Sequence, residues 1–547
     1  MSEPPKPVPF AATAAFRRLS DLARKPHDLT APGGFSPARI AALRASACGL
    51  DLLYAAQRVS PDAVEALAAL ARETGAVEQF RAMVQGAVVN RIEGHASENR
   101  RVLHFAARHL FDDLPDRPEA RLPGDAVADA RNEAARLARF LDGVDRGTVC
   151  NARGESFTEL INVGIGGSDL GPRALYVALQ PWRLPGRRVH FVSNVDPDDP
   201  AQVLRQAHLE RTLVNVVSKS GSTLETRTDE ILVRQAFVRA GLDPGAHFVC
   251  VTAPGSPLDA SRAYREKFHT FDFIGGRYSA TSVVGGVSLG FGLGFAAFSD
   301  LLRGAREMDL ASLDLNLATN LPLLLALLGV WNRNFLGLET LAVIPYSQAL
   351  SRFVAHLQQL DMESNGKAIT RAGQPVGWDT GPVVWGEPGT NSQHAFFQLL
   401  HQGPGAVPCE FLGFRESQYG EDLEVDGTTS QHKLLANLLG QVIALATGKA
   451  DANPNRRFPG NRPSTVIVAQ RLTPRVLGQL LALYENKVAY QGFLWGINSF
   501  DQEGVELGKV VAKRVLPLLV SGADPAASRD PSSIEAALLR AARIVAG

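Results

Sequence analysis

The sequence is poor in cysteine and carries no net charge. Four cysteines are scattered through 547 residues without any CxxC pair, at Cys48, Cys150, Cys250 and Cys409. This argues against a zinc ribbon, a thioredoxin-like site and a disulfide framework, and favours a reducing, cytoplasmic location. The 56 basic residues balance 56 acidic ones, whereas proteins that bind nucleic acids or membrane surfaces in general lean basic. We therefore expect no nucleic-acid or membrane partner, and any anionic ligand must be held locally.

Long hydrophobic runs and metal-binding spacings are also missing. The two most apolar windows, Val283–Phe298 and Leu321–Val330, are shorter than the roughly 20 residues that a transmembrane helix needs. We expect both to be buried core elements. The opening residues MSEPPKPVPF lack a basic segment followed by a long apolar core, so no secretory signal is expected. No HExxH, HxH or EF-hand spacing occurs, so we expect no metal and no cofactor, and no Gly-x-Ser-x-Gly elbow argues for a serine nucleophile.

What remains is the composition of an ordinary globular protein, with 45% apolar and 20% charged residues. From about residue 121, short β-type runs alternate with helical patterns, which predicts an α/β protein with doubly wound, mainly parallel sheets. The expected strands are Phe157–Val163, Val189–Val192, Thr212–Val217, His247–Thr252, Thr340–Ile344, Pro382–Trp385 and Thr465–Val468.

The length predicts several domains, roughly two to four. We expect a helical segment over residues 1–120 that packs on the larger domain, a small α/β domain over 121–290, and a large α/β domain over 291–515. The remaining residues, 516–547, have the Ala-rich pattern of a helical tail.

A loop crowded with hydroxyls lies between an expected strand and an expected helix over Leu224–Ala240. We call it the seryl loop; its members are Ser218, Lys219, Ser220, Gly221, Ser222 and Thr223. The N–H groups and positive dipole end of a helix N-terminus, together with hydroxyls and a lysine, suit a phosphate monoester. A capping box between Ser222 and Glu225 would explain one hydroxyl without a ligand, but not four hydroxyls beside a lysine.

A second loop, rich in glycine, follows the strand expected at Phe157–Val163. This glycine loop, Gly164–Gly171, includes Gly167 and Ser168. It matches neither the dinucleotide fingerprint, because its sixth position is Asp169, nor a Walker loop. Its glycines allow backbone N–H groups to approach a ligand, although a tight strand-to-helix turn explains them equally well. Both loops fall where open α/β sheets bind ligands, at the carboxyl ends of strands.

The stretch DMESNGK at 361–367 carries the acid that we interpret as a general base. Apolar residues at 350, 353, 354, 357 and 360 predict a helix, and Asn365-Gly366 predicts its end with left-handed C-cap geometry. Glu363 then lies in the last turn, where a carboxylate opposes the helix dipole. Gln359 is four residues earlier on the same flank. Periodicity alone places Asp361 nearer the apolar stripe, and a solvated helix end is the alternative.

Three further side chains are candidates for acid, base or electrophile. Arg277 follows two glycines and suits a phosphate or an oxyanion, or else a structural ion pair. His394 lies in the first turn of an expected helix, which favours neutral imidazole, but a lone histidine is more often structural. Lys509 lies beside the apolar stripe Leu507, Val510, Val511 and Val515, where a surface lysine is the simpler interpretation.

Six stretches, taken together and in order, resemble the phosphoglucose isomerase family, whose members contain two sugar-isomerase (SIS) units. They span some 350 residues and read VGIGGSDLGP at 163–172, SKSGST at 218–223, GGRYS at 275–279, QLDMESNGK at 359–367, GEPGTNSQHAFFQLLHQG at 386–403 and INSFDQEGVELGK at 497–509.

The resemblance implies reversible conversion of glucose 6-phosphate to fructose 6-phosphate, in glycolysis and gluconeogenesis, through an enediolate and without a cofactor. Glu363 would move the proton between C2 and C1, His394 with Lys509 would open the ring, and Arg277 would stabilise the enediolate. Gln359 and Gln502 would contact the sugar. The phosphate would lie against Gly167, Ser168, Ser218, Lys219, Ser220 and Thr223.

The family also implies a homodimer in which His394 comes from the neighbouring subunit. Two alternatives stay open: an isomerase of broader hexose-phosphate specificity that also takes mannose 6-phosphate, and a sugar-phosphate sensor without catalysis. A sensor would keep the seryl loop but need not keep Glu363, His394 and Lys509 together.

Overall fold

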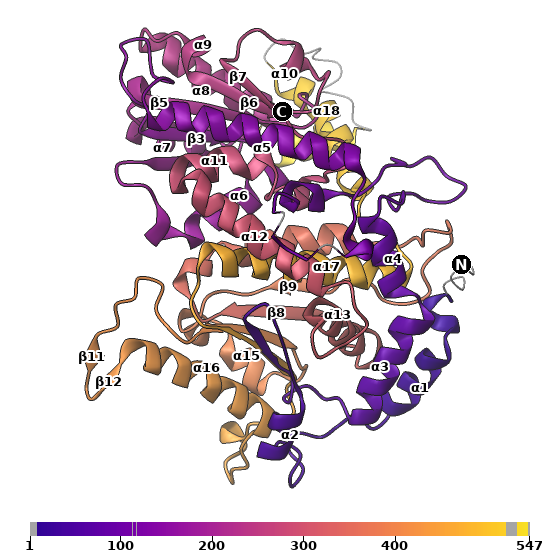
Figure 1. Cartoon of the computed structure of the whole chain (residues 1–547). Helices are drawn as coiled ribbons and strands as arrows, with labels where there is room; N and C mark the ends of the chain where they lie inside the picture. The colour runs from indigo at the N-terminus through magenta and orange to yellow at the C-terminus, as the bar shows by residue number, and fades with distance from the viewer. Residues whose placement is uncertain (1–7, 112, 116, 521–532, 545–547) are drawn as a thin grey trace. The chain divides into compact units, whose positions relative to one another are not determined.

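The computed structural model describes residues 8–111, 113–115, 117–520 and 533–544. The chain forms two compact units, Met1–Ser499 and Phe500–Gly547, and each is described by itself. The first unit contains two separate parallel-type sheets (Figure 1). This confirms the predicted α/β class.

The smaller sheet has five strands, all parallel, in the order β4-β3-β5-β6-β7. Its central strands, β3, β5 and β6, are fully buried because helices cover both faces. Val233 and Phe237 of α8 pack with Ile161 and Val214 in one apolar cluster. The bounds are β3 Glu159–Val163, β4 Arg188–Val192, β5 Thr212–Val217, β6 Phe248–Thr252 and β7 Glu266–His269. The helices are α5 Gly124–Asp145, α6 Leu170–Ala178, α7 Asp198–Gln206, α8 Leu224–Arg239, α9 Pro244–His247, α10 Pro257–Ala260 and α11 Val283–Leu293.

The larger sheet has six strands in the order β1-β2-β13-β10-β8-β9. Strands β13, β10, β8 and β9 are parallel, and β2 joins β13 antiparallel. The bounds are β1 Arg44–Ala47, β2 Leu50–Leu53, β8 Thr340–Pro345, β9 Val383–Trp385, β10 Cys409–Phe414 and β13 Ser464–Ala469. A separate two-stranded ribbon is formed by β11 Glu424–Val425 and β12 Thr428–Thr429. The helices are α12 Phe295–Ala311, α13 Leu321–Val330, α14 Phe353–Gln358, α15 Phe397–Gln402, α16 Ser430–Thr447 and α17 Pro474–Trp495.

Helix α17 forms the core between the two sheets (Figure 1). Residues 477–495 are all buried, polar ones included, and α12 and α13 pack along them. The first apolar window of the sequence forms α11 and the start of α12, and the second forms α13. Every residue of α11 is buried, as are nine of the ten in α13. The prediction of core elements is confirmed for α11 and α13, whereas Gly294–Ala297, near the end of the first window, are partly buried or exposed. No helix in the described part of the chain is long and apolar enough to cross a bilayer.

The N-terminal segment differs from the expectation of helices alone. It contains α1 Ala14–Ala23, α2 Pro37–Ala42, α3 Pro61–Glu73 and α4 Ala76–Val84, but also the hairpin β1–β2. Its turn uses Cys48 and Gly49, both with positive φ. Strand β2 pairs with β13, so this segment completes the larger sheet. The boundaries of the four predicted domains stay predictions.

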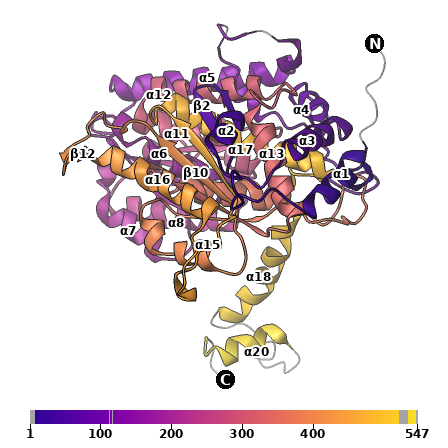
Figure 2. The ribbon, with the colours of Figure 1, turned by 90° about the horizontal axis from the view of Figure 1, so that it is seen from below.

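The second unit contains α18 Glu506–Leu519 and α20 Ile534–Ala541, both labelled in Figure 2. The predicted apolar stripe of α18 is exposed at Leu507 and Val510. Part of the predicted tail, 521–532 and 545–547, lies outside the described residues.

Candidate functional site

The seryl loop joins β5 to α8, and a residue of the neighbouring strand β6 holds its backbone. Ser218 is buried, and its hydroxyl lies 3.2 Å from that of Thr223. Thr252, at the end of β6, donates its hydroxyl to the Ser218 carbonyl at 2.7 Å. Ser220 is exposed, and its hydroxyl accepts from the N–H of Ser222 at 3.2 Å. The loop therefore presents hydroxyls to solvent from a backbone that a buried threonine fixes.

The N-terminus of α8 is not capped by a side chain. Thr223 occupies the N-cap position, but its hydroxyl accepts no bond from the first turn. The capping box that the spacing of Ser222 and Glu225 allowed does not form, because Ser222 lies before the cap and bonds to Ser220. The first N–H groups of a 16-residue helix are thus available to an acceptor, which is the arrangement that binds phosphate.

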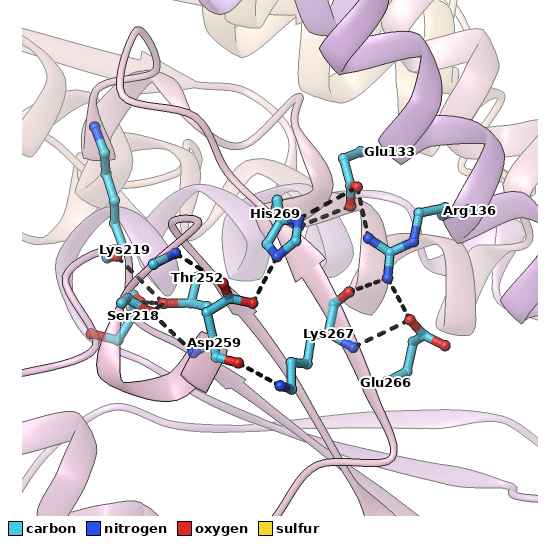
Figure 3. A network of polar contacts seen from close by, with 11 residues as sticks. Glu133, Arg136, Ser218, Lys219, Thr252, Asp259, Glu266, Lys267 and His269 are labelled. Atoms are coloured by element: carbon cyan, nitrogen blue, oxygen red, sulfur yellow. Dashed lines mark hydrogen bonds and ion pairs between the residues drawn. The ribbon is translucent and has the colours of Figure 1, made fainter. Parts of the chain in front are cut away.

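Lys219 anchors the loop in this structure. Its ammonium donates to the carbonyls of Asp272 at 2.9 Å and Ile274 at 3.0 Å, and lies 3.3 Å from the Asp272 carboxylate. Figure 3 shows the side chain extending away from Ser218 and Thr252. Burial lowers the pKa of Lys219. Its contacts fasten the seryl loop to the segment that leads into Arg277.

A polar network of residues from β6, α10 and β7 supports the seryl loop (Figure 3). The Thr252 hydroxyl also lies 2.7 Å from that of Ser256, which caps α10. Asp259 accepts from the Gly255 N–H at 2.8 Å and lies 2.9 Å from the His269 imidazole. The Gly255 N–H, followed by His269, holds the pKa of Asp259 below its usual value. A chain of contacts thus connects His269, on β7, to the carbonyl of Ser218.

The glycine loop packs directly against the segment that carries Arg277. A Cβ on Gly167 would lie 2.1 Å from the Gly276 carbonyl oxygen, so only glycine fits this approach. Gly166 has φ +60°, and a Cβ there would meet the Gln359 amide nitrogen at 3.2 Å. Because β3 and β5 are neighbours, this loop and the seryl loop lie side by side at the carboxyl edge of the sheet.

Glu363 and Arg277, which the sequence predicted as separate candidates, form an ion pair. Arg277 is 2% exposed, and its Nη1 lies 3.2 Å from Oε2 of Glu363. Its Nε donates to Ser364 Oγ at 2.6 Å and its Nη2 to the Ser499 carbonyl at 2.7 Å. Glu363 keeps 17% of its side chain exposed. A fixed guanidinium therefore stands beside a carboxylate that a ligand can reach.

The helix carrying Glu363 ends in a π-turn. Helix α14 continues into η10, a π-helix over Gln359–Glu363, and such wide turns are frequent at functional sites. The predicted helix end at Asn365-Gly366 is confirmed, but neither residue has the predicted left-handed backbone. Glycine is needed at position 366 because a side chain has no room there: a Cβ would lie 2.6 Å from the Met362 carbonyl oxygen.

Asp361 faces the core, as helical periodicity indicated. It is buried, 3.9 Å from Lys487, which also pairs with Glu410 of β10 at 3.1 Å. Burial raises the pKa of Asp361 to about 6, although Lys487 opposes the shift. Glu363 is thus the acid of this turn that meets solvent, and Asp361 is a buried structural partner.

The other predicted catalytic residues come from other elements of the chain. His394 lies in a 3₁₀ turn, η11 Asn391–His394, and is exposed. The α-helix after it, α15, starts only at Phe397. Gln502 and Lys509 belong to the second unit, where Lys509 pairs with Glu506 at 2.7 Å.

Two serines at the centre were not singled out from the sequence. Ser364 and Ser499 hold Arg277, and Ser499 also donates its hydroxyl to Asn365 Oδ1 at 2.7 Å. The sequence signal that could have identified these serines was their position inside the stretches QLDMESNGK and INSFDQEGVELGK. No periodicity could have revealed that both stretches meet one guanidinium.

The arrangement can bind a phosphate, hold a developing oxyanion and move a proton. The seryl loop and α8 offer donors for the phosphate, Arg277 offers the cation, and Glu363 is an accessible carboxylate. The loops that carry these groups contact one another through Lys219 and Gly167.

Comparison with known proteins agrees with this geometry. Residues 53–537 match the family model described as phosphoglucose isomerase. Glucose-6-phosphate isomerase of Desulfotalea psychrophila is 53% identical over 505 residues, covering 92% of this chain and 93% of the relative. That of Protochlamydia amoebophila is 52% identical over 511 residues, covering 93% of each.

Solved structures give the same result. The crystal structure of a glucose-6-phosphate isomerase from Chlamydia trachomatis superposes with a TM-score of 0.90 at 48% identity, over 98% of this chain and 100% of that one. A hypothetical protein from Thermus thermophilus reaches a TM-score of 0.62 at 27% identity, over 82% of this chain and 96% of that one. With the family model covering most of its length and two relatives more than half identical to it, the chain belongs to the phosphoglucose isomerase family.

Proposed function

We propose that this protein interconverts D-glucose 6-phosphate and D-fructose 6-phosphate. The observations that carry the proposal are the pairing of the accessible carboxylate of Glu363 with the buried guanidinium of Arg277, and the uncapped N-terminus of α8. Membership of the family and the printed names of the relatives support the choice of substrate. The free state of all four cysteines agrees with a cytoplasmic enzyme.

The phosphate does not react, so its role is to place the sugar. Hydroxyls of Ser218, Ser220 and Thr223, with the first N–H groups of α8, receive it. The Lys219 ammonium anchors the loop through two carbonyl oxygens and brings its positive charge to the phosphate end of the ligand. Gly167 and Ser168 add backbone and hydroxyl donors from the neighbouring loop. Binding energy from this end is used to hold C1 and C2 against Glu363, which raises the rate.

Proton transfer follows at the other end of the sugar. Glu363 removes the proton from C2 of the open-chain aldose, and the electron pair moves toward the carbonyl to give an enediolate. Arg277 meets the charge that develops on oxygen, a contribution of a few kcal/mol in comparable sites. A proton passes from O2 to O1, and the same carboxyl returns its own proton to C1, which yields the ketose and restores the carboxylate. Gln359, whose Oε1 is buried without a partner among the described residues, lies at the same turn and would contact the sugar.

Ring opening requires a second acid–base group, and we assign it to His394 with Lys509, with Gln502 near the substrate. His394 is exposed and bonds to none of the described residues near Glu363. Such a histidine can serve the site of a second copy, so the proposal includes a homodimer in which His394 crosses the interface.

The dimer assignment is tested by mixing two inactive variants, Glu363→Gln and His394→Ala. A mixed dimer holds one site with both wild-type residues, so random reassociation restores about one quarter of wild-type activity. No recovery, with exchange shown by mass spectrometry of tagged subunits, would place His394 in its own subunit's site.

The decisive experiment on function incubates the purified protein with fructose 6-phosphate in the presence of EDTA and measures glucose 6-phosphate formed. Turnover without added metal is expected. Binding without turnover would favour the sensor, and production of mannose 6-phosphate alongside would favour the broader isomerase. Absence of binding would reject all three readings.

A further inference from the structure

A cavity of about 680 Å³ lies apart from the residues described so far. None of its lining residues belongs to the glycine loop, the seryl loop or the Glu363–Arg277 pair. Its size falls within the range of about 300–1,000 Å³ typical of small-molecule sites. Two chain segments form much of its wall, one around Thr370–Trp378 and the other around Phe493–Gly496.

The wall combines aromatic rings with an excess of positive charge. Phe10 and Trp378 lie with ring centroids 5.4 Å apart, and Trp495 lines the same space. Arg371 extends over the Phe493 ring at 5.4 Å and bonds to the neutral amide of Gln79 rather than to a carboxylate.

The charge balance of the cavity is positive. Arg91 is exposed and pairs with no carboxylate in the described part of the chain, while Glu93 is the single acid in the lining. Two guanidiniums thus face one carboxylate. Burial lowers the pKa of Arg371, as expected for a cation that lacks a full counter-charge. A ligand that supplies an anionic group would relieve this imbalance.

We propose that this cavity is a second ligand site, which takes an organic anion bearing an aromatic ring system. The anionic group pairs with Arg371 and Arg91, and the ring lies against Trp378, Trp495 and Phe10. A guanidinium suits a carboxylate, sulfonate or phosphate equally well in charge and geometry. Aromatic walls favour a planar apolar body.

The proposal includes linkage to substrate binding, because the chain next to each wall segment contacts Arg277. Ser364, six residues before the first segment, accepts from Arg277, and the carbonyl of Ser499, three residues after the second, does the same. The two segments are bonded to each other by the Arg371 N–H and the Gly496 carbonyl at 2.8 Å. An occupant that shifts either segment alters the support of Arg277, and linkage makes the effect reciprocal.

The test uses two fluorescent probes of matching shape. Anilinonaphthalene sulfonate carries the ring system and an anionic group, and N-phenyl-1-naphthylamine carries the ring system alone. We expect the sulfonate to bind one per chain, with energy transfer from tryptophan that falls in Trp378→Phe. Arg371→Met should weaken its binding about tenfold and Arg91→Met about threefold, in line with the loss of a charge-assisted bond, while the affinity of the neutral probe stays unchanged.

Two controls separate this site from the isomerase site and from general surface binding. Arg239→Met, at the end of α8, removes an exposed arginine elsewhere and should leave the affinity unchanged. Ser220→Ala should also leave it unchanged. Equal affinity for both probes, undiminished binding in Arg371→Met, or no binding would overturn the site. Saturating fructose 6-phosphate should shift the dissociation constant of the sulfonate about threefold; identical constants would overturn the linkage.

Discussion

Two regions of the candidate site offer partners to negative charge by different means. The seryl loop offers hydroxyls and the N–H groups of an uncapped helix, and Ser220 is exposed. The Glu363–Arg277 pair offers a single guanidinium that is 2% exposed and held by Ser364 and Ser499. The seryl loop therefore has a donor open to solvent at Ser220, whereas the guanidinium of Arg277 is already paired with Glu363.

The difference follows from what each region must do. Phosphate keeps its charge throughout the proposed reaction, so several weak donors at a helix N-terminus are sufficient. The enediolate exists only transiently, so its cation must be fixed in advance and must not reorganise when charge appears. Arg277 meets this requirement through its contacts to Ser364, Ser499 and Glu363. Variants of the two regions should therefore affect different kinetic constants.

The largest effect is expected from Glu363→Gln. The amide keeps the shape of the side chain but cannot accept the C2 proton, so kcat should fall at least about 10³-fold, within the range for loss of a general base. Calorimetry should show that fructose 6-phosphate still binds. Asp361→Asn is the matched control on the same turn: it should lower thermal stability by weakening the Lys487 cluster while kcat falls less than about tenfold. The reverse pattern would make Asp361 the base.

Arg277→Lys tests whether geometry matters beyond charge. Lysine keeps the cation but loses the planar fork that reaches Ser364, Ser499 and Glu363 together. We expect kcat to fall about 10²-fold with little change in KM, as for loss of one oxyanion donor. The measurement is steady-state kinetics in both directions. A rise in KM alone would mean that Arg277 binds the ground state and is no part of the enediolate site.

The sequence predicted those parts of the site whose residues are neighbours in the chain. The seryl loop could be recognised because hydroxyls, glycine and lysine cluster within Ser218–Thr223. Its anchoring by Lys219 could not, since the carbonyls that hold the ammonium lie 53 and 55 residues away. For the same reason Glu363 and Arg277 were found as separate candidates. Neither periodicity nor spacing carries information about an ion pair between distant segments.

The fold was predicted to a similar extent. Strand β5 was predicted with its observed bounds, and the other six predicted strands overlap observed ones within a few residues. Strand β10, in the middle of the larger sheet, was missed because Glu410 interrupts its apolar run; the compensating Lys487 is 77 residues later. The π-turn at η10 was also missed, since periodicity describes only a regular helix.

At the seryl loop, substitutions should act on KM. Lys219→Met removes the anchor to Asp272 and Ile274, so KM for fructose 6-phosphate should rise about tenfold. Ser220→Ala removes one exposed hydroxyl and should raise KM about threefold. Inhibition by inorganic phosphate should weaken by the same factors, because it reports the phosphate end alone. Unchanged KM and phosphate inhibition in both variants would remove the loop from the binding site.

The smallest effect is expected behind the loop, at His269. This imidazole holds Asp259, whose neighbour Ser256 supports Thr252 and through it the Ser218 carbonyl. His269→Ala should raise KM about twofold with kcat unchanged. His269→Gln should restore KM, because an amide can still donate to Asp259. The matched control is His208→Ala, which breaks a similar pair with Glu159 at 2.7 Å. Glu159 is the first residue of β3 and so lies at the amino ends of the strands of the same sheet, away from the seryl loop. If both alanine variants raise KM equally, the effect is loss of general stability. If His269→Ala alone does so and glutamine rescues it, the seryl loop owes its shape to the hydrogen-bonded side chains that support it, as Arg277 does to Ser364 and Ser499.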